Sequence, residues 1–132
     1  MFLIKKYLLF LLFGAIYLSG FPGREDKIPV DVIRSFETGN AKVLAQYFNQ
    51  NIEMSIFDKQ NFYSKPQAQQ IVAKFFNTNT PESFSILSRV DEKDAINVIG
   101  LLKTKNGTFR VYILLKETDK KEFIHLLKIE KR

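Results

Sequence analysis

Cysteine and tryptophan are absent from this chain, and histidine occurs once among its 132 residues, as His125. A chain without cysteine has no disulfide framework, no zinc–thiolate site, no iron–sulfur cluster and no cysteine nucleophile. Gly-rich phosphate loops, G-x-S-x-G elbows and H-E-x-x-H pairs are missing as well. We therefore predict no cofactor, no metal site and a fold held together by packing, to which 13 Phe and 5 Tyr contribute.

A hydrophobic run long enough to span a membrane is also missing. Lys5 and Lys6 precede an uninterrupted apolar run from Tyr7 to Leu18, whereas a spanning helix needs about 20 apolar residues. A secretory signal needs only about 7–15, between a basic start and small residues such as Ser19 and Gly20. The pattern predicts a secretory signal peptide, which would anchor the chain in the membrane if it were not cleaved.

The predicted signal divides the chain into three parts. Residues 1–20 are the signal peptide, residues 21–27 a polar lead-in, and residues 28–132 a single domain. The last part has the length of one ordinary domain. We expect export to the periplasm or the cell exterior, with no integral membrane span after the signal is removed.

Positive charge exceeds negative charge only modestly in this chain. The chain has 20 Lys and Arg against 14 Asp and Glu, a net charge of +6. Without residues 1–20, which hold two Lys and no acid, 18 basic residues face 14 acidic ones, a net +4. The C-terminal basic residues alternate with acids near the ends of expected strands, which keeps sheet edges soluble. Nucleic-acid binding needs a clustered basic face with stacking aromatics, so we expect no nucleic-acid partner.

Two short helices and a strand are predicted at the start of the domain. Pro29 fits a first helical turn, and Gly39 ends the helix that follows. Asn40 is a suitable N-cap for a second helix. The apolar face of that second helix would hold Ala41, Leu44, Tyr47 and Phe48. Apolar and polar residues then alternate over residues 52–57, which is typical of a strand.

A longer helix is predicted over residues 65–77. Ser64 and Gln67 have the spacing of a capping box, with Pro66 in the first turn. Its apolar positions recur at helical spacing and form one broad stripe. These positions are Ala68, Ile71, Val72, Phe75 and Phe76. We expect this stripe to be buried against a sheet.

Four strands in succession are predicted after this helix, at residues 83–90, 95–103, 108–116 and 122–130. Asn106-Gly107 is a strong hairpin signal between two of them. The resulting order is α-α-β-α-β-β-β-β. Helices followed by a run of strands favour an α+β fold, here a cone in which a curved antiparallel sheet packs around the long helix.

Three segments resemble those of the nuclear transport factor two-like (cystatin-like cone) superfamily. They are Ser35–Phe48, Tyr63–Ala68 with Phe75-Phe76, and Asn106–Tyr112, and the resemblance spans about residues 25–130. More narrowly, the chain is similar to a small exported family of unknown function from gram-negative bacteria. The resemblance implies the cone fold. It does not assign an activity, because the superfamily includes isomerases, dehydratases and many non-catalytic modules.

Enzymes of this superfamily place a carboxylate or a histidine inside the cone. Glu53 and Asp58, near the first strand, are the two acids that could point inward. His125 shares strand parity with Phe123 and Leu127, so a packed imidazole is the simpler interpretation. No partner that would orient its second ring nitrogen can be assigned. We therefore assign no catalytic residue.

The candidate ligand-binding residues are Tyr63, Arg110 and Tyr112. Arg110 and Tyr112 share parity on a strand that otherwise looks buried, and Tyr63 precedes the capped helix. A guanidinium on an apolar strand must find a partner, either an anionic ligand or a carboxylate of the chain. We expect these three residues near the mouth of an apolar cavity.

Two classes of function remain open. The first is an exported, non-catalytic module that binds a small apolar or anionic ligand or an envelope protein, with a homodimer through the sheet face as a further expectation. The second is a small isomerase or dehydratase-like enzyme that uses the same cavity. A carboxylate or histidine in the cavity within reach of Tyr or Arg would favour the enzyme, and a wholly apolar cavity would favour the module.

Overall fold

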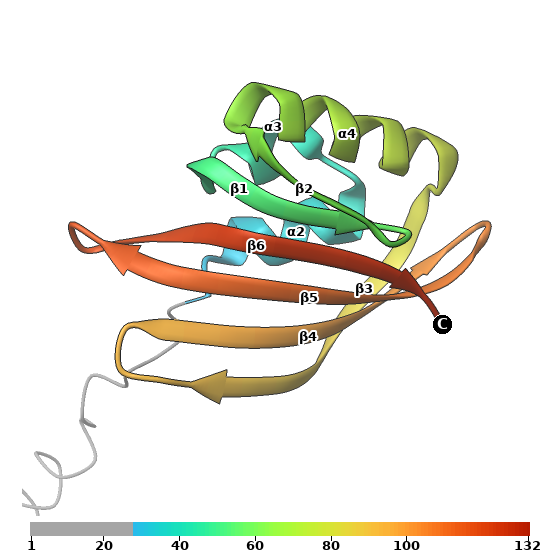
Figure 1. Cartoon of the computed structure of the whole chain (residues 1–132). Coiled ribbons are helices and arrows are strands. Elements are labelled where there is room, and N and C mark those ends of the chain that lie inside the picture. Colours follow the sequence, from blue (N-terminus) through green and yellow to red (C-terminus); the bar gives the residue numbers. More distant parts are fainter. Residues whose placement is uncertain (1–27) are drawn as a thin grey trace, which may run out of the picture.

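The computed structural model describes residues 28–132, which begin with two short helices (Figure 1). α2 (Val30–Thr38) ends at Gly39, whose φ of 70° is the left-handed conformation that glycine adopts without strain. α3 (Ala41–Ala45) begins at Asn40, whose side chain accepts a hydrogen bond from a backbone amide of the first turn. The predicted end of the first helix and the predicted cap of the second are both confirmed.

Six strands form one curved sheet in the order β2-β1-β6-β5-β4-β3 (Figure 1). Every neighbouring pair is antiparallel except β1 and β6, which run parallel. The strands are β1 (Phe48–Ile56), β2 (Lys59–Ser64), β3 (Pro81–Asp91), β4 (Ala95–Thr104), β5 (Gly107–Thr118) and β6 (Lys121–Lys131). The α+β cone predicted from the sequence is confirmed.

The long helix, α4 (Lys65–Thr78), carries the predicted capping box. The Ser64 side chain accepts a hydrogen bond from the Gln67 amide, and the Gln67 side chain accepts one from the Ser64 amide. Both bonds satisfy donors that the first helical turn would otherwise leave unpaired. Of the predicted stripe, only Ile71 is half-buried, because it borders a pocket; the other four residues are buried.

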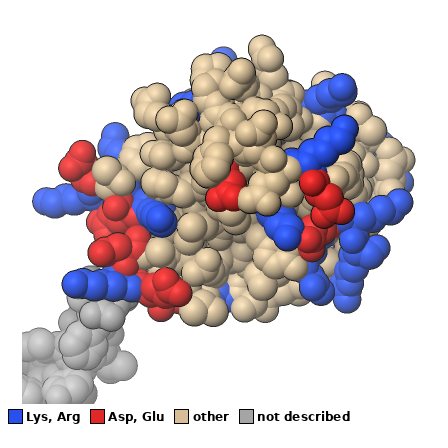
Figure 2. All heavy atoms as spheres, viewed as in Figure 1, with Lys and Arg blue, Asp and Glu red and all other residues tan. Residues whose placement is uncertain are grey.

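The two faces of the sheet differ in their cover. Along β5, Phe109, Val111 and Ile113 are buried in the core, while Arg110 and Tyr112 between them are half-buried. Successive side chains of a strand point to opposite faces, so the buried set faces the helices. We call this side the helix-covered face and the other the open face. In the view of Figure 2, acidic and basic side chains gather together toward the two ends of the molecule.

Three details differ from the sequence prediction. Strand β2 was not predicted, because its first four residues are exposed and it lacks an apolar alternation. The sheet is mixed, not wholly antiparallel, since β1 pairs in parallel with the last strand of the chain. Tyr47 and Phe48 do not belong to the second helix, which ends at Ala45; Phe48 begins β1.

None of the helices within residues 28–132 is long and apolar enough to cross a membrane. The predicted signal peptide and lead-in, residues 1–27, lie outside the described residues.

Candidate ligand-binding pocket

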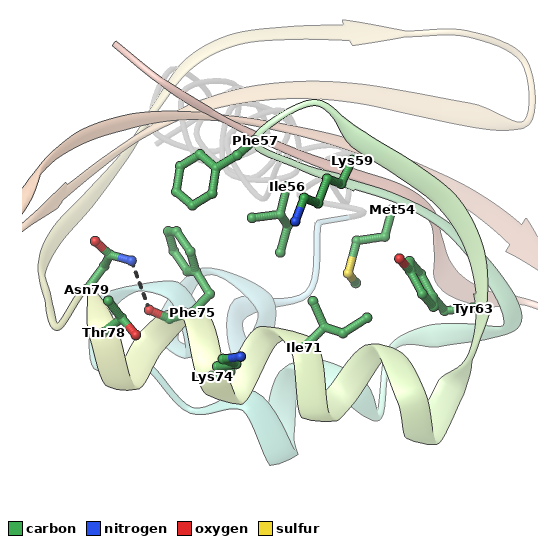
Figure 3. A pocket seen from close by; sticks show the side chains of 10 residues that line it. All are labelled: Met54, Ile56, Phe57, Lys59, Tyr63, Ile71, Lys74, Phe75, Thr78 and Asn79. Carbon is green, nitrogen blue, oxygen red and sulfur yellow. Dashed lines mark hydrogen bonds between the residues drawn. The ribbon is translucent and has the colours of Figure 1, made fainter.

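A pocket of about 460 Å³ lies between α4 and the β1–β2 hairpin (Figure 3). Its deep wall is apolar: Met54 of β1 is 1 % exposed, and Phe75 of α4 is 5 % exposed. The residues that line it are Met54, Ile56, Phe57, Lys59, Tyr63, Ile71, Lys74, Phe75, Thr78 and Asn79. A volume of this size is in the range of small-molecule sites.

The hairpin turn that borders the pocket has an unusual sequence. Ile56 pairs with Lys59, and the two residues between them, Phe57 and Asp58, have φ of 53° and 65°. Positive φ at both central positions defines a type I′ turn, where Asn-Gly is the usual choice and a bulky residue is strained. The Phe57 ring lies 6.1 Å from the ring of Phe75 (centroid to centroid). The strained turn thus places an aromatic ring at one end of the pocket.

The two charged groups of the pocket are both cations. Lys59 and Lys74 are exposed and come from the two opposite walls, β2 and α4, while Tyr63 is half-buried (Figure 3). Within residues 28–132 neither ammonium group makes an ion pair, and the Tyr63 hydroxyl has no hydrogen-bond partner. At the far end, the Asn79 side-chain amide donates to the Phe75 carbonyl at 3.2 Å and holds the end of α4.

A second hollow of about 310 Å³ continues the pocket along α4. It shares Tyr63, Ile71 and Lys74 with the first and adds Gln67 and Gln70. The two hollows together form a groove along one side of α4. The groove opens from a buried apolar end toward a polar, exposed end.

The structure does not bring the three predicted binding residues together. Tyr63 lines the pocket, on the helix-covered face, where it pairs with buried Ile52. Arg110 and Tyr112 lie on the open face of β5. The ammonium of Lys128 is 5.7 Å from the centre of the Tyr112 ring, and the Nε of Arg110 is buried without a hydrogen-bond partner. The structure therefore places Tyr63, but neither Arg110 nor Tyr112, in the lining of this pocket.

The two candidate acids also lie outside the pocket lining. Glu53 is half-buried and accepts a hydrogen bond from the Gln60 side chain. Its register with Phe62 and Leu126 places it on the open face. Asp58 is exposed in the hairpin turn.

His125 lies at an irregularity of β6. Leu126 pairs with Leu114, but Ile124 pairs with Leu115, so β6 has one extra residue there, a β-bulge. The predicted shared parity of His125 with Leu127 is therefore wrong: Leu127 is buried, whereas His125 is half-buried. Burial, and to a smaller extent the charge of Lys116, lowers the pKa of His125, whose Nε2 is buried without a hydrogen-bond partner.

The chemistry of the pocket follows from this donor set. Its lining includes no carboxylate and no imidazole, and residues 28–132 hold no group of three His, Asp or Glu side chains placed to bind a metal ion. The pocket can bind an apolar body and offer hydrogen-bond donors and positive charge at its rim. Sequence reasoning found Tyr63 but missed Lys59 and Lys74; the spacing of Ile71, Lys74 and Thr78 along one side of α4 was the available signal.

Residues 29–130 match the family model of the domain of unknown function DUF4783. The chain belongs to the DUF4783 family. A comparison with curated proteins finds no match.

Solved structures agree with the family assignment. A DUF4783 protein from Bacteroides uniformis is 30% identical, with a TM-score of 0.76, and the match covers 80% of this chain and 97% of that one. A DUF4783 protein from Bacteroides ovatus is 28% identical, with a TM-score of 0.78, over 80% of this chain and 96% of that one.

The predicted superfamily is confirmed at the level of fold. An NTF-2 like protein of unknown function from Silicibacter pomeroyi is 11% identical, with a TM-score of 0.61, over 78% of this chain and 88% of that one. At this identity the likeness concerns the fold alone. This DUF4783 chain therefore has the NTF2-like cone.

Proposed function

We propose that this protein is an exported, non-catalytic module that binds a small, largely apolar ligand in the pocket between α4 and the β1–β2 hairpin. The observation that carries this proposal is the pocket itself: about 460 Å³, with an apolar deep wall formed by Met54 and Phe75. Binding pockets are typically apolar with a few placed polar groups, and Lys59, Tyr63 and Lys74 are such groups here.

The donor set supports a binding role over an isomerase or dehydratase. Such enzymes need a carboxylate or histidine base within hydrogen-bond reach of the substrate. No such group lines this pocket: Glu53 and His125 lie elsewhere in the fold, and Asp58, in the bordering hairpin turn, is not part of the lining. If the protein turns over a substrate and the turnover depends on any of these three residues, the protein is an enzyme and the proposal of a non-catalytic module is wrong.

Export rests on the sequence of residues 1–20. A basic start followed by a short apolar run is typical of a secretory signal. A chain without cysteine is compatible with an oxidising compartment, because it has no thiol to oxidise.

Calorimetric titration of the purified protein with octanol, an uncharged amphiphile, tests the pocket. The change Ile71→Trp adds bulk to the helix wall of the pocket and is expected to abolish octanol binding. The matched control is Leu114→Trp, at a half-buried apolar position on the open face. Circular dichroism establishes that both variants are folded.

We expect octanol to bind the unchanged protein and the Leu114→Trp variant alike. At a tenfold excess over Kd the ligand should stabilise the fold by about 1.4 kcal/mol and raise Tm by several degrees. Octanol binding that is lost in Leu114→Trp but kept in Ile71→Trp would place the site on the open face and contradict the proposal.

A further inference from the structure

We propose that the ligand is an amphipathic anion, with its apolar chain against Met54 and Phe75 and its acid group at the rim beside Lys59 and Lys74. This inference rests on the proposed function and names the class of ligand. A single-chain carboxylate, similar in form to a short fatty acid, is the chemistry that fits.

Polarity changes across the pocket in one direction. The residues at the deep wall, Met54 and Phe75, are almost fully buried and apolar. The two lysines are exposed, one on the hairpin and one on the helix (Figure 3). A ligand that matches this arrangement has an apolar end that enters first and a polar end that stays near water.

The charged groups of the rim have one sign. An ammonium group only donates, and a tyrosine hydroxyl that has no partner can also donate. Lys59, Lys74 and Tyr63 thus supply three donor side chains, and no carboxylate lines the pocket. Charge-assisted hydrogen bonds from cations are strongest to carboxylate or phosphate. An acceptor with negative charge is therefore the complementary head group.

The nearby acid of the hairpin lies close to a different cation. The hydrogen bond to Glu130 and the negative charge of Glu130 raise the pKa of Lys128 most, and Tyr112 and then Asp58 add smaller effects in the same direction. Lys128 belongs to β6 and lies on the open face with Tyr112. Within residues 28–132, neither rim lysine forms an ion pair with Asp58 or with any other acid.

The size of the pocket limits the ligand to one chain. Small-molecule sites of about 300–1,000 Å³ bury most of a drug-sized ligand, and this pocket, at about 460 Å³, is at the lower end. The adjoining hollow at Gln67 and Gln70 extends the polar end, which gives the head group room to reach water.

Three amphiphiles with the same tail test this inference: octanoate, octanol and octylammonium, each titrated calorimetrically into the purified protein. We expect octanoate to bind about three- to tenfold more tightly than octanol, with octylammonium weakest, because each exposed charge pair contributes only modestly to affinity. The preference for octanoate should shrink as salt is added.

The double variant Lys59→Gln/Lys74→Gln should bind octanoate no more tightly than it binds octanol. Its matched control is Lys42→Gln/Lys103→Gln, which removes the same two charges from exposed positions outside the pocket. In the control we expect the preference to remain.

The outcomes separate the two proposals. If octanol binds and octanoate binds no more tightly, the proposal of an anionic ligand is wrong, but the proposal of a binding module still holds. If the control variant loses the preference as fully as the pocket variant, net charge explains it and the rim site is wrong. If none of the three amphiphiles binds, the proposed function itself is contradicted.

Discussion

Arg110 lies on the open face of β5, between Leu101 of β4 and Glu130 of β6 in the register of the sheet. Glu130 forms its ion pair with Lys128, at 2.9 Å, and not with Arg110. The Nε of Arg110 is thus buried without a partner. A buried unpaired donor lowers stability by about 1–3 kcal/mol, so this guanidinium does not contribute to the fold through a hydrogen bond at Nε.

We expect Arg110→Met to leave the free energy of unfolding unchanged or to raise it by about 1 kcal/mol, because Met keeps the apolar stem and removes the unpaired donor. Urea denaturation measures the change. Octanol affinity should be the same as in the unchanged protein, since Arg110 and the pocket lie on opposite faces. If the Arg110→Met variant folds but no longer binds octanol, Arg110 is part of the binding site and the pocket assignment is wrong.

His125 gives the fold a dependence on pH. Burial, with a smaller effect of Lys116, lowers its pKa below the ordinary 6.5, so the unfolded chain binds the proton more readily than the folded one. The free energy of unfolding should therefore fall as pH drops below about 6.5 and level off below the folded-state pKa. In His125→Gln this part of the dependence should disappear, as measured by urea denaturation between about pH 7.5 and 5. An identical slope in both proteins would show that other groups cause it.

At the scale of elements, α4 was the most predictable part of the chain. Ser64 and Gln67 mark the first turn of the helix, and the apolar stripe defines its buried side. Both signals are local, because the residues that form them lie close together in the sequence. β2 was not predictable in the same way, because its pairing with β1, and not its own composition, makes it a strand. The parallel pairing of β1 with β6 joins residues more than 70 positions apart. No local sequence pattern predicts a pairing over that separation.

At Phe57, in the β1–β2 turn, backbone strain and aromatic contacts have opposite effects on stability. The left-handed conformation costs a non-glycine residue about 1–2 kcal/mol, and contacts with the rings of Phe75 and Phe109 offset it by about 0.5–1.5 kcal/mol each. Phe57→Asn, which suits positive φ, should therefore change the free energy of unfolding by less than about 1 kcal/mol. Octanol affinity should fall about three- to tenfold, because one end of the pocket loses its ring.

The matched control is Asp119→Asn in the β5–β6 turn, where Asp119 has φ of 50°. This change places Asn in a left-handed turn position away from the pocket, so octanol affinity should not change. Unaltered affinity in Phe57→Asn would mean that the ring is not part of the binding surface.

At the scale of the whole molecule, the cone fold and the family could be read from the sequence, but the site could not. The pocket combines a turn, an edge strand and one side of a helix, and Lys59 and Lys74 meet there only because β2 leads directly into α4. Arg110 and Tyr112 were credible candidates because the sequence shows which residues share a face of β5, without showing which face the helices cover.

Export is a prediction about the whole chain. Protein recovered from the cell envelope should have an intact mass that lacks residues 1–20, since the apolar run from Tyr7 to Leu18 is short and followed by small residues. Mass spectrometry of the intact protein measures this directly. Soluble cytoplasmic protein that still begins at Met1 would contradict it.

The location of the binding site is the central claim, and an amide correlation spectrum recorded during titration with octanoate tests it most directly. We predict that the shifts centre on Met54, Ile71 and Phe75, around the pocket. The amides of Arg110 and Tyr112, on the open face, should move little. Shifts centred on Arg110 and Tyr112, with Met54, Ile71 and Phe75 unchanged, would contradict the account.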